Sequence, residues 1–151
     1  MQTTVEIGQT LFEETARLTG VTEYGVSWEK LIRGEAQLPL QGARFDIAFE
    51  GSLEGDRIKG TIKGIDYATV RADGRFDMSI HATITTDDGA RIAFYEDGVL
   101  TPNGDGTATL RLNMRFTTAH PAYAWLNTVQ AWGTGVANQQ SGEVRVTASL
   151  V

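Results

Sequence analysis

The feature that most constrains the fold of this chain is the alternation of apolar and polar residues over residues 75–85. The apolar side chains that share one face are those of Phe76, Met78, Ile80, Ala82 and Ile84. A period of two predicts a β-strand with one buried face and one solvated face, as in antiparallel sheets. Asp-Gly dipeptides ending at Gly74 and Gly89 flank this segment and favour tight connections between antiparallel strands. Residues 57–98 therefore predict a meander of three neighbouring strands.

Similar segments recur along the whole chain and are separated by turn signals. Further strands are predicted at residues 9–19, 44–51, 107–116, 128–137 and 143–151. The first of these has a mixed character, because Glu14 shares its parity with Phe12, Ala16 and Leu18, and Gly20 is expected to end it. Short helical turns are expected at residues 27–32, with Ser27 as N-cap, and after Pro121.

About eight strands with regular turn spacing and almost no helix predict an all-β fold. We expect residues 1–151 to form a single-domain antiparallel up-and-down β-barrel of about eight strands, with at most one or two short helical turns. Closure into a barrel is favoured over a sandwich because it removes exposed strand edges. A barrel of this size either fills itself with side chains or holds one small ligand.

Composition excludes several classes of function. The formal net charge is −6, with 13 basic residues against 19 acidic ones, whereas nucleic-acid binding needs clustered Lys and Arg. The absence of Cys excludes disulfides and thiolate chemistry. No apolar run approaches the ~20 residues that cross a membrane, and the first residues lack the features of a signal peptide. We therefore expect a cytoplasmic protein with neither a nucleic-acid nor a membrane partner.

Standard catalytic and metal-binding motifs are absent from the sequence. With two His and no Cys, no metal site and no cofactor are expected. The acidic run at residues 86–89 is too short to supply the six or more oxygens of a calcium site. It is instead interpreted as a hairpin turn whose Asp side chains cap backbone donors.

Three segments resemble a known family. They are residues 63–67 (Lys-Gly-Ile-Asp-Tyr), 86–92 (Thr-Asp-Asp-Gly-Ala-Arg-Ile) and 123–127 (Tyr-Ala-Trp-Leu-Asn). In order and spacing they resemble the bacterial and fungal domain of unknown function catalogued as number 3237, from about Arg44 to the C-terminus. The resemblance implies a small β-barrel, similar to allene oxide cyclase and lipocalin-like barrels, and no established chemistry. The chain departs from the family pattern at residues 114–117, where relatives carry Pro-Arg-Phe-Glu.

Strand parity singles out two carboxylates. Asp66 shares the parity of Ile58 and Ile62, and Glu96 shares that of Ile92 and Phe94, so both are predicted to point into the barrel. A carboxylate in an apolar interior is costly unless it is paired, protonated or hydrogen-bonded, which makes both residues candidates for proton transfer. In the alternative, both lie in solvent at strand ends, or bulges at Gly60 and Gly64 turn Asp66 outward.

A second group of candidates lies in the segment after the sixth predicted strand. His120, Tyr123, Trp125 and Asn127 either form a lid that plugs the barrel or form a pocket wall in which His120 serves as an acid or base. On residues 128–137 the face with the larger side chains is predicted to point inward, which places Gln130 and Trp132 inside the barrel. The remaining predicted ligand contacts are Trp28, Tyr67, Phe94 and Met114.

The sequence leaves three hypotheses for function. The first is a cofactor-independent isomerase, cyclase or lyase that uses carboxylate acid–base chemistry on a small hydrophobic oxygenated molecule, with Asp66, Glu96 and His120 as catalytic candidates. The second is a non-catalytic carrier for a small hydrophobic ligand. The third is a filled barrel that acts through its outer surface as a homo-oligomer.

Overall fold

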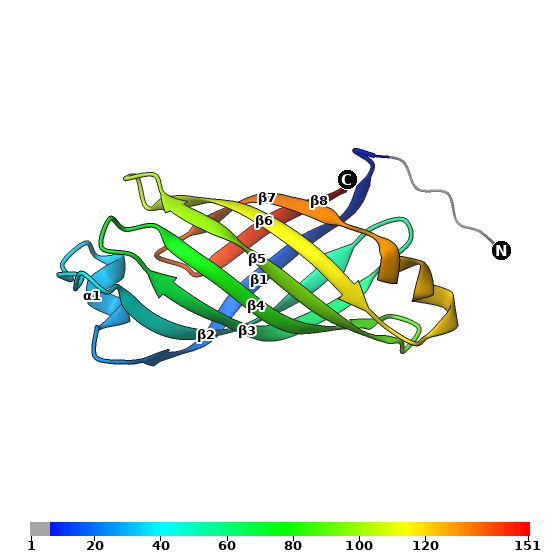
Figure 1. Ribbon diagram of the computed structural model, residues 1–151, viewed down its shortest axis with the longest axis horizontal. Helices are drawn as coiled ribbons and strands as arrows, with labels where there is room; N and C mark the ends of the chain where they lie inside the picture. Colours follow the sequence, from blue (N-terminus) through cyan, green and yellow to red (C-terminus); the bar gives the residue numbers. More distant parts are fainter. Residues whose placement is uncertain (1–6) are drawn as a thin grey trace.

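The computed structural model describes residues 7–151 and confirms an all-β fold, a closed antiparallel barrel of eight strands (Figure 1). The strands are β1 (Thr10–Glu23), β2 (Ala43–Glu54), β3 (Gly60–Val70), β4 (Phe76–Thr86), β5 (Arg91–Pro102), β6 (Thr107–Thr117), β7 (Ala131–Asn138) and β8 (Glu143–Leu150). Residues 1–6, on which the signal-peptide expectation rests, lie outside the described residues. No helix in the described part is long and apolar enough to cross a membrane.

The barrel closes between its first and last strands. Each strand pairs with the next one in the chain, and β1 pairs with β8 from Thr10↔Ser149 to Arg17↔Glu143. Because every strand has two neighbours, no edge of the sheet is left open. The up-and-down order places successive connections at alternate ends of the barrel.

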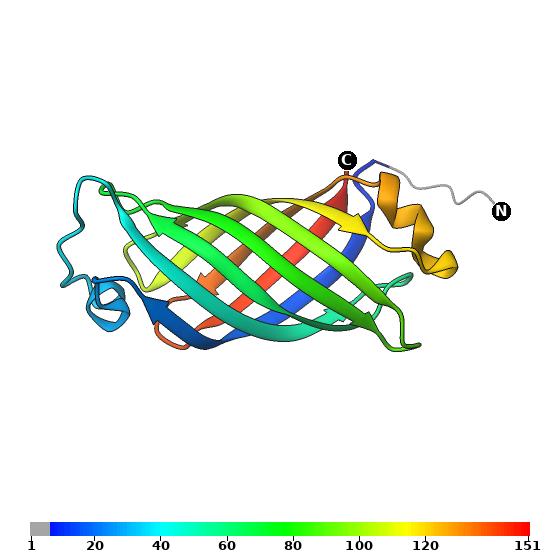
Figure 2. The same ribbon diagram turned by 60° about the horizontal axis from the view of Figure 1, so that its bottom comes forward.

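Two short helices lie at opposite ends of the barrel (Figures 1 and 2). Helix α1 (Trp28–Ile32) follows β1, and the Ser27 hydroxyl accepts a hydrogen bond from the Lys30 N–H at 3.2 Å, which confirms the predicted N-cap. The 3-10 helix η1 (Pro121–Thr128) follows β6, and its Leu126 side chain is fully buried.

The interior is filled with side chains at the η1 end. The rings of Phe12, Phe94 and Phe116 pack with centroids 5.1–6.5 Å apart. The strands run obliquely around this core, and their inward positions supply almost all of the buried apolar residues. On β4 the inward face is the one predicted, with Phe76, Ile80 and Ile84 buried.

Several strand boundaries differ from the sequence prediction, most clearly the ends of β1 and β5. Strand β1 continues past Gly20 to Glu23, with a register shift between Leu18 and Gly20. Gly20 therefore marks an irregularity within the strand and does not end it. Strand β5 likewise extends beyond the predicted residues to Pro102.

The predicted parity of β7 is wrong. Trp132 and Val136 lie outside, 57% and 52% exposed, whereas Ala131, Gly133 and Ala137 are buried. The inner face of β7 carries small residues because large side chains of the neighbouring strands fill the space in front of it. A Cβ at Gly133 would meet the Met114 Cε at 2.5 Å and Val146 at 3.0 Å. Gln130, which precedes the strand, is half-buried against an outer-surface hollow.

This inverted face yields a stability prediction. Gly135→Ala should lower the free energy of unfolding by ~1–3 kcal/mol, because the new Cβ would stand 2.1 Å from the Arg145 carbonyl oxygen. Trp132→Thr should change it by no more than ~0.5 kcal/mol, as exposed positions usually do. Urea unfolding of both variants measures these values, and a larger loss for the Trp132 variant would contradict the outward placement.

Candidate functional site

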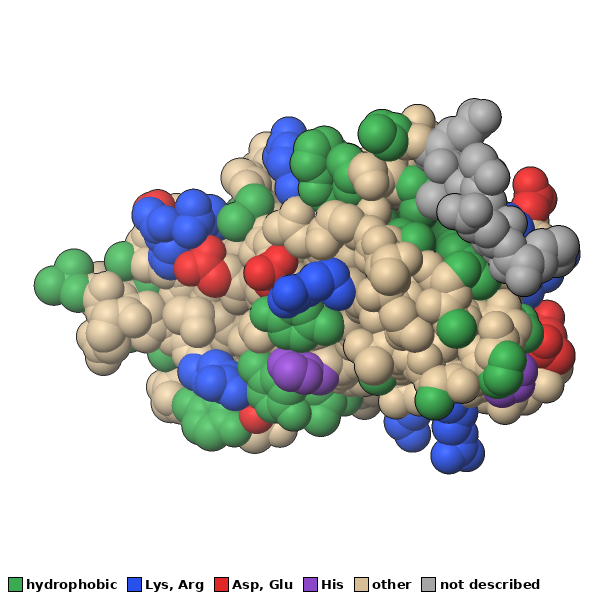
Figure 3. All heavy atoms as spheres, turned by 45° about the vertical axis from the view of Figure 1, so that its right-hand side comes forward, with side chains coloured by type: hydrophobic (Ala, Val, Ile, Leu, Met, Phe, Trp, Pro, Cys, Tyr) green, Lys and Arg blue, Asp and Glu red, His purple; other side chains and the backbone are tan. Residues whose placement is uncertain are grey.

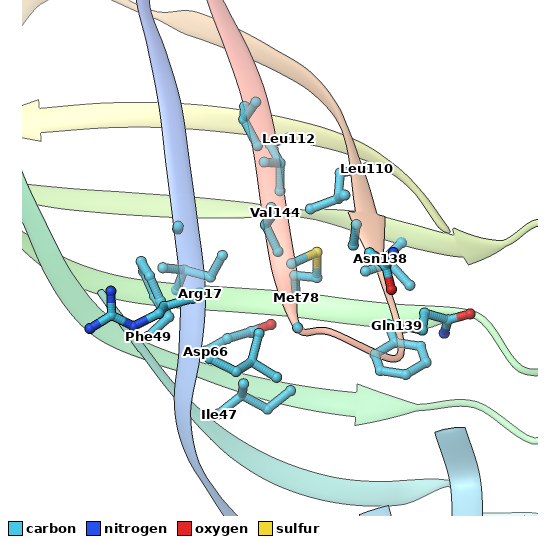
Figure 4. A pocket seen from close by; sticks show the side chains of 18 of the residues that line it. Arg17, Ile47, Phe49, Asp66, Met78, Leu110, Leu112, Asn138, Gln139 and Val144 are labelled. Atoms are coloured by element: carbon cyan, nitrogen blue, oxygen red, sulfur yellow. The ribbon is translucent and has the colours of Figure 1, made fainter. Parts of the chain in front are cut away.

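A cavity of ≈100 Å³ lies inside the barrel, in the half that faces α1. Its walls are almost entirely apolar; they include Ile47, Phe49, Met78, Leu110, Leu112 and Val144 (Figure 4). Trp28 of α1 and Gln139 of the β7–β8 turn border it at the α1 end of the barrel. Larger hollows of ≈570 and ≈670 Å³ lie on the outer surface and contain no buried carboxyl group.

Three carboxyl groups face this cavity from three strands. Glu14 on β1, Asp66 on β3 and Glu96 on β5 line it and are 5%, 5% and 2% exposed. Asp66 pairs with Ile80, and Ile80 pairs with Glu96, so the two acids lie in one cross-strand row. Two strand spacings of ~4.8 Å separate their backbones, and both side chains point inward.

The carboxyl groups lie directly above the aromatic core. Phe12 precedes Glu14 by two residues on β1, and Phe94 precedes Glu96 by two residues on β5. Both strands run from the η1 end towards the α1 end (Figure 1). The phenyl rings therefore lie on the η1 side of the carboxyl groups, which stand at the boundary between the filled and the hollow half of the barrel.

Hydrogen bonding of the three groups is incomplete. The Asp66 Oδ1 accepts from the Ser79 backbone N–H at 3.0 Å. The β3–β4 register omits the pairs that would involve Tyr67 and Ala68, so the sheet is locally interrupted where this carboxylate takes a backbone donor. The Glu14 Oε1 and the Glu96 Oε2 have no hydrogen-bond partner among the described residues. Buried oxygens without partners are rare in folded proteins.

Burial shifts the pKa values of these acids upward. It raises the pKa of Glu14 to about 7, and that of Asp66 to about 6 although the Ser79 N–H and the Arg44 charge favour its ionised form. Burial raises the pKa of Glu96 well above its usual range, and the negative charges of Glu14 and Asp66 raise it further. The negative charges of Glu14 and Asp66 oppose the ionisation of Glu96, so the three acids titrate as a coupled set in which Glu96 favours its protonated form. The site therefore combines an acid whose protonated form is favoured by burial and neighbouring charges, Glu96, with one whose ionised form the Ser79 N–H stabilises, Asp66.

The described residues hold no cluster of three or more His, Asp and Glu side chains arranged to bind a metal ion. The charged side chains nearest the site lie outside the barrel. Arg17 borders the cavity, but its guanidinium points outward and pairs with Glu50 at 2.7 Å.

The structure brings only some of the predicted site residues together. Asp66, Glu96 and Trp28 line the cavity, and the Trp28 ring packs edge-on against Phe45 and Phe76. Phe94 and Met114 are inside the barrel, but they belong to the filled core and not to the cavity wall. The bulges considered for Gly60 and Gly64 do not occur, since β2 and β3 pair without a register shift.

Two predicted contacts lie on the outer surface. Tyr67 is 36% exposed and stacks edge-on with His81, while Trp132 is outside as described above. Tyr67 follows Asp66 directly, so strand alternation puts it on the opposite face. Figure 3 shows part of the outer surface, with charges of both signs scattered between small hydrophobic groups.

The η1 group lies at the opposite end of the barrel from α1. His120 is exposed and caps η1, its Nδ1 accepting from the Ala122 N–H at 3.4 Å. The Tyr123 hydroxyl donates to Asp88 at 2.9 Å, and the Arg57 guanidinium lies 3.8 Å from the centre of the Trp125 ring.

The Asn127 side chain exchanges hydrogen bonds of 2.8 Å with the backbone of Thr118. None of the η1 residues lines the cavity. Of the two interpretations of this segment, its geometry is that of a lid.

Sequence reasoning did not select Glu14 as a site residue. Its parity with Phe12 and Ala16 was visible, and the same argument that identified Asp66 and Glu96 applies to it. The mixed pattern of the first strand concealed it, because one charged residue on an apolar face weakens the assignment of the face itself.

The raised pKa values predict a pH dependence of stability. Between pH ~4 and ~7 the folded protein holds protons on Asp66 and Glu14 that the unfolded chain has released, so the free energy of unfolding should fall as pH rises. Asp66 alone should account for ~3 kcal/mol at ~1.4 kcal/mol per pKa unit. The carboxylates with lowered pKa values, such as Asp88, act at lower pH and do not mask this slope.

Urea unfolding at intervals between pH 4 and pH 8 measures the slope. Asp66→Asn should flatten it and leave the protein at least as stable as the parent at pH 8. Asp97→Asn, on the same strand as Glu96 but on the outer face, is the matched control and should keep the slope. A stability that rises from pH 4 to pH 7 in the parent protein would contradict the buried acid cluster.

Comparisons with known proteins agree with this architecture. The hydroalkoxylation enzyme phnH of Penicillium herquei is 34% identical over 85 residues, which are 56% of this chain and 51% of that protein, so the match spans about half of the relative. A solved β-barrel-like protein from Acinetobacter baumannii has a TM-score of 0.78 at 23% identity and covers 99% of both chains. A solved enzyme from Penicillium herquei has a TM-score of 0.58 at 23% identity and covers 99% of this chain and 100% of its own.

At these identities the two structural likenesses show a shared fold. The family model described as "Protein of unknown function (DUF3237)" matches residues 39–151, three quarters of the chain. The chain therefore belongs to the DUF3237 family of proteins of unknown function.

Proposed function

We propose that this protein is a cofactor-independent acid–base enzyme that acts on a small hydrophobic molecule. It adds the O–H group of a substrate hydroxyl across a carbon–carbon double bond, so that the oxygen bonds to one carbon and hydrogen to the other. The observation that carries the proposal is the placement of Asp66 and Glu96 in one apolar cavity, where burial raises both pKa values while the Ser79 N–H and the Arg44 charge hold that of Asp66 lower. Two titratable groups whose environments keep one ionised and the other protonated are the usual basis of acid–base catalysis.

The roles follow from the protonation states. Asp66, with a pKa of about 6, is ionised at neutral pH and is the base that takes the proton of the substrate hydroxyl. Glu96 is protonated and gives its proton to one carbon of the double bond as the oxygen bonds to the other. One C–O and one C–H bond form while the O–H bond and the C=C π bond break. The addition is redox-neutral, and a proton shift from Asp66 to Glu96 restores the starting state.

Glu14 has a supporting role in this scheme. It lies in the same cavity, and its charge raises the pKa of Glu96. It therefore helps to keep the acid protonated at neutral pH, where a carboxyl group in water would be ionised. A pKa of about 7 also makes Glu14 a suitable relay for the proton that must return to Glu96.

The choice of reaction class has support from the relative named as a hydroalkoxylation enzyme. Isomerisation and the reverse elimination need the same pair of a general acid and a general base, because each reaction adds one proton to the substrate and removes another. A carrier would need the cavity but not the split in pKa values.

Turnover of ortho-alkenylphenols to cyclic ethers tests the proposal. In D₂O the product should carry one non-exchangeable deuterium on carbon, since the acid exchanges with solvent before it protonates the substrate. Glu96→Gln and Asp66→Asn should each lower turnover by ~100-fold or more, the usual contribution of one acid–base group. Mass spectrometry of the product measures both effects.

Asp97→Asn is the control for this experiment. Its side chain lies on the outer face and accepts from Asn113 at 3.1 Å, so turnover should stay at the parent level. Binding of the alkenylphenols without turnover would contradict the enzyme hypothesis and favour the carrier hypothesis. Full activity of Glu96→Gln would remove Glu96 as the acid.

A further inference from the structure

The acidic groups of the cavity are gathered at one end of it. Its deep end carries the three carboxyl groups of Glu14, Asp66 and Glu96, and the rest of its wall is apolar except for Asn138 and Gln139 at the α1 end. No described Lys or His lines it, and the guanidinium of Arg17 is engaged outside by Glu50. A negative charge on a ligand would thus meet like charges with no cation to balance them.

Two oxygens in this deep end lack hydrogen-bond partners. The Glu14 Oε1 and the Glu96 Oε2 are both buried, and no described donor reaches either of them. A carboxylate accepts only, and a protonated carboxyl group donates a single hydrogen bond. The cavity therefore has more acceptors than donors, and a ligand lowers the cost of burying these oxygens only if it brings a donor of its own.

We infer that the cavity selects compact apolar ligands that present a hydroxyl group to the carboxyl cluster, and that it excludes carboxylates and phosphates. The hydroxyl end points away from α1 towards the carboxyl groups, and the apolar body lies against the aliphatic wall. The space suits a body of about one ring. This inference deepens the proposed function, because it names the ligand class of the same site, and it concerns binding alone.

Three probes that share one ring and differ at a single group test the inference: benzyl alcohol, toluene and benzoate. Titration at pH 8, where Asp66 and Glu14 are ionised, is followed by the methyl NMR signals of Met78 and Ile80, which line the cavity. Benzyl alcohol should bind about tenfold more tightly than toluene, because a hydrogen bond to a charged group gives a net gain of that order. Benzoate should bind at least ~100-fold more weakly than the alcohol.

Variants assign the selectivity to the carboxyl groups. In the double variant Glu14→Gln, Asp66→Asn the gap between alcohol and benzoate should narrow by tenfold or more, because the charges that repel benzoate are gone. Asp97→Asn should leave the gap unchanged. If the double variant does not fold, the three probes with the parent protein still decide the inference.

Benzoate binding as tightly as the alcohol, toluene binding at least as tightly as the alcohol, or no binding of any probe would overturn the inference. Failure of the proposed function looks different. A protein that follows the predicted order of probes but converts no alkenylphenol keeps this ligand class and loses the enzymatic role.

Discussion

The hydrogen bonding between β1 and β8 is the constraint on which the rest of the molecule depends. Once the sheet is closed, each strand must send every second side chain into a space of fixed width. Residues at these positions cannot turn towards water without a bulge, so their chemistry is imposed on the interior. Glu14, Asp66 and Glu96 are buried for this reason, and the buried apolar side chains of all eight strands offset the cost.

The same geometry explains why the carboxyl groups have raised pKa values. The phenyl rings below them exclude water from one side, and the aliphatic wall does so from above. The backbone offers little compensation, because the inner surface of a closed sheet has no free N–H groups. The one exception, the Ser79 N–H that binds Asp66, is available only where the β3–β4 ladder is interrupted. Burial raises the pKa of Asp66 to about 6 and that of Glu14 to about 7, and Asp66 is the group with that bond.

The parts of the fold that depend on local pattern could be predicted from the sequence. Alternation on β4 gave the correct inner face, and the same rule placed Asp66 and Glu96 inside. The rule failed on β7, where Ala131, Gly133 and Gly135 point inward and Trp132 does not. Which face carries the larger residues depends on how much space Met114 and Val146 leave, and that is a property of neighbouring strands. The separation of His120 from Trp28 was implicit in the predicted topology, because the first and sixth connections of an up-and-down barrel lie at opposite ends.

The closed η1 end limits how a ligand can reach and leave the cavity. Leu126 is buried there, and Tyr123 ties the helix to the β4–β5 turn, whereas the residues that border the cavity at a barrel end belong to α1 and the β7–β8 turn. In the proposed reaction, substrate entry and product exit would thus share the α1 end, and a product would have to leave before the next molecule could enter. Such a dead-end chamber suits rearrangement within a single molecule better than the joining of two.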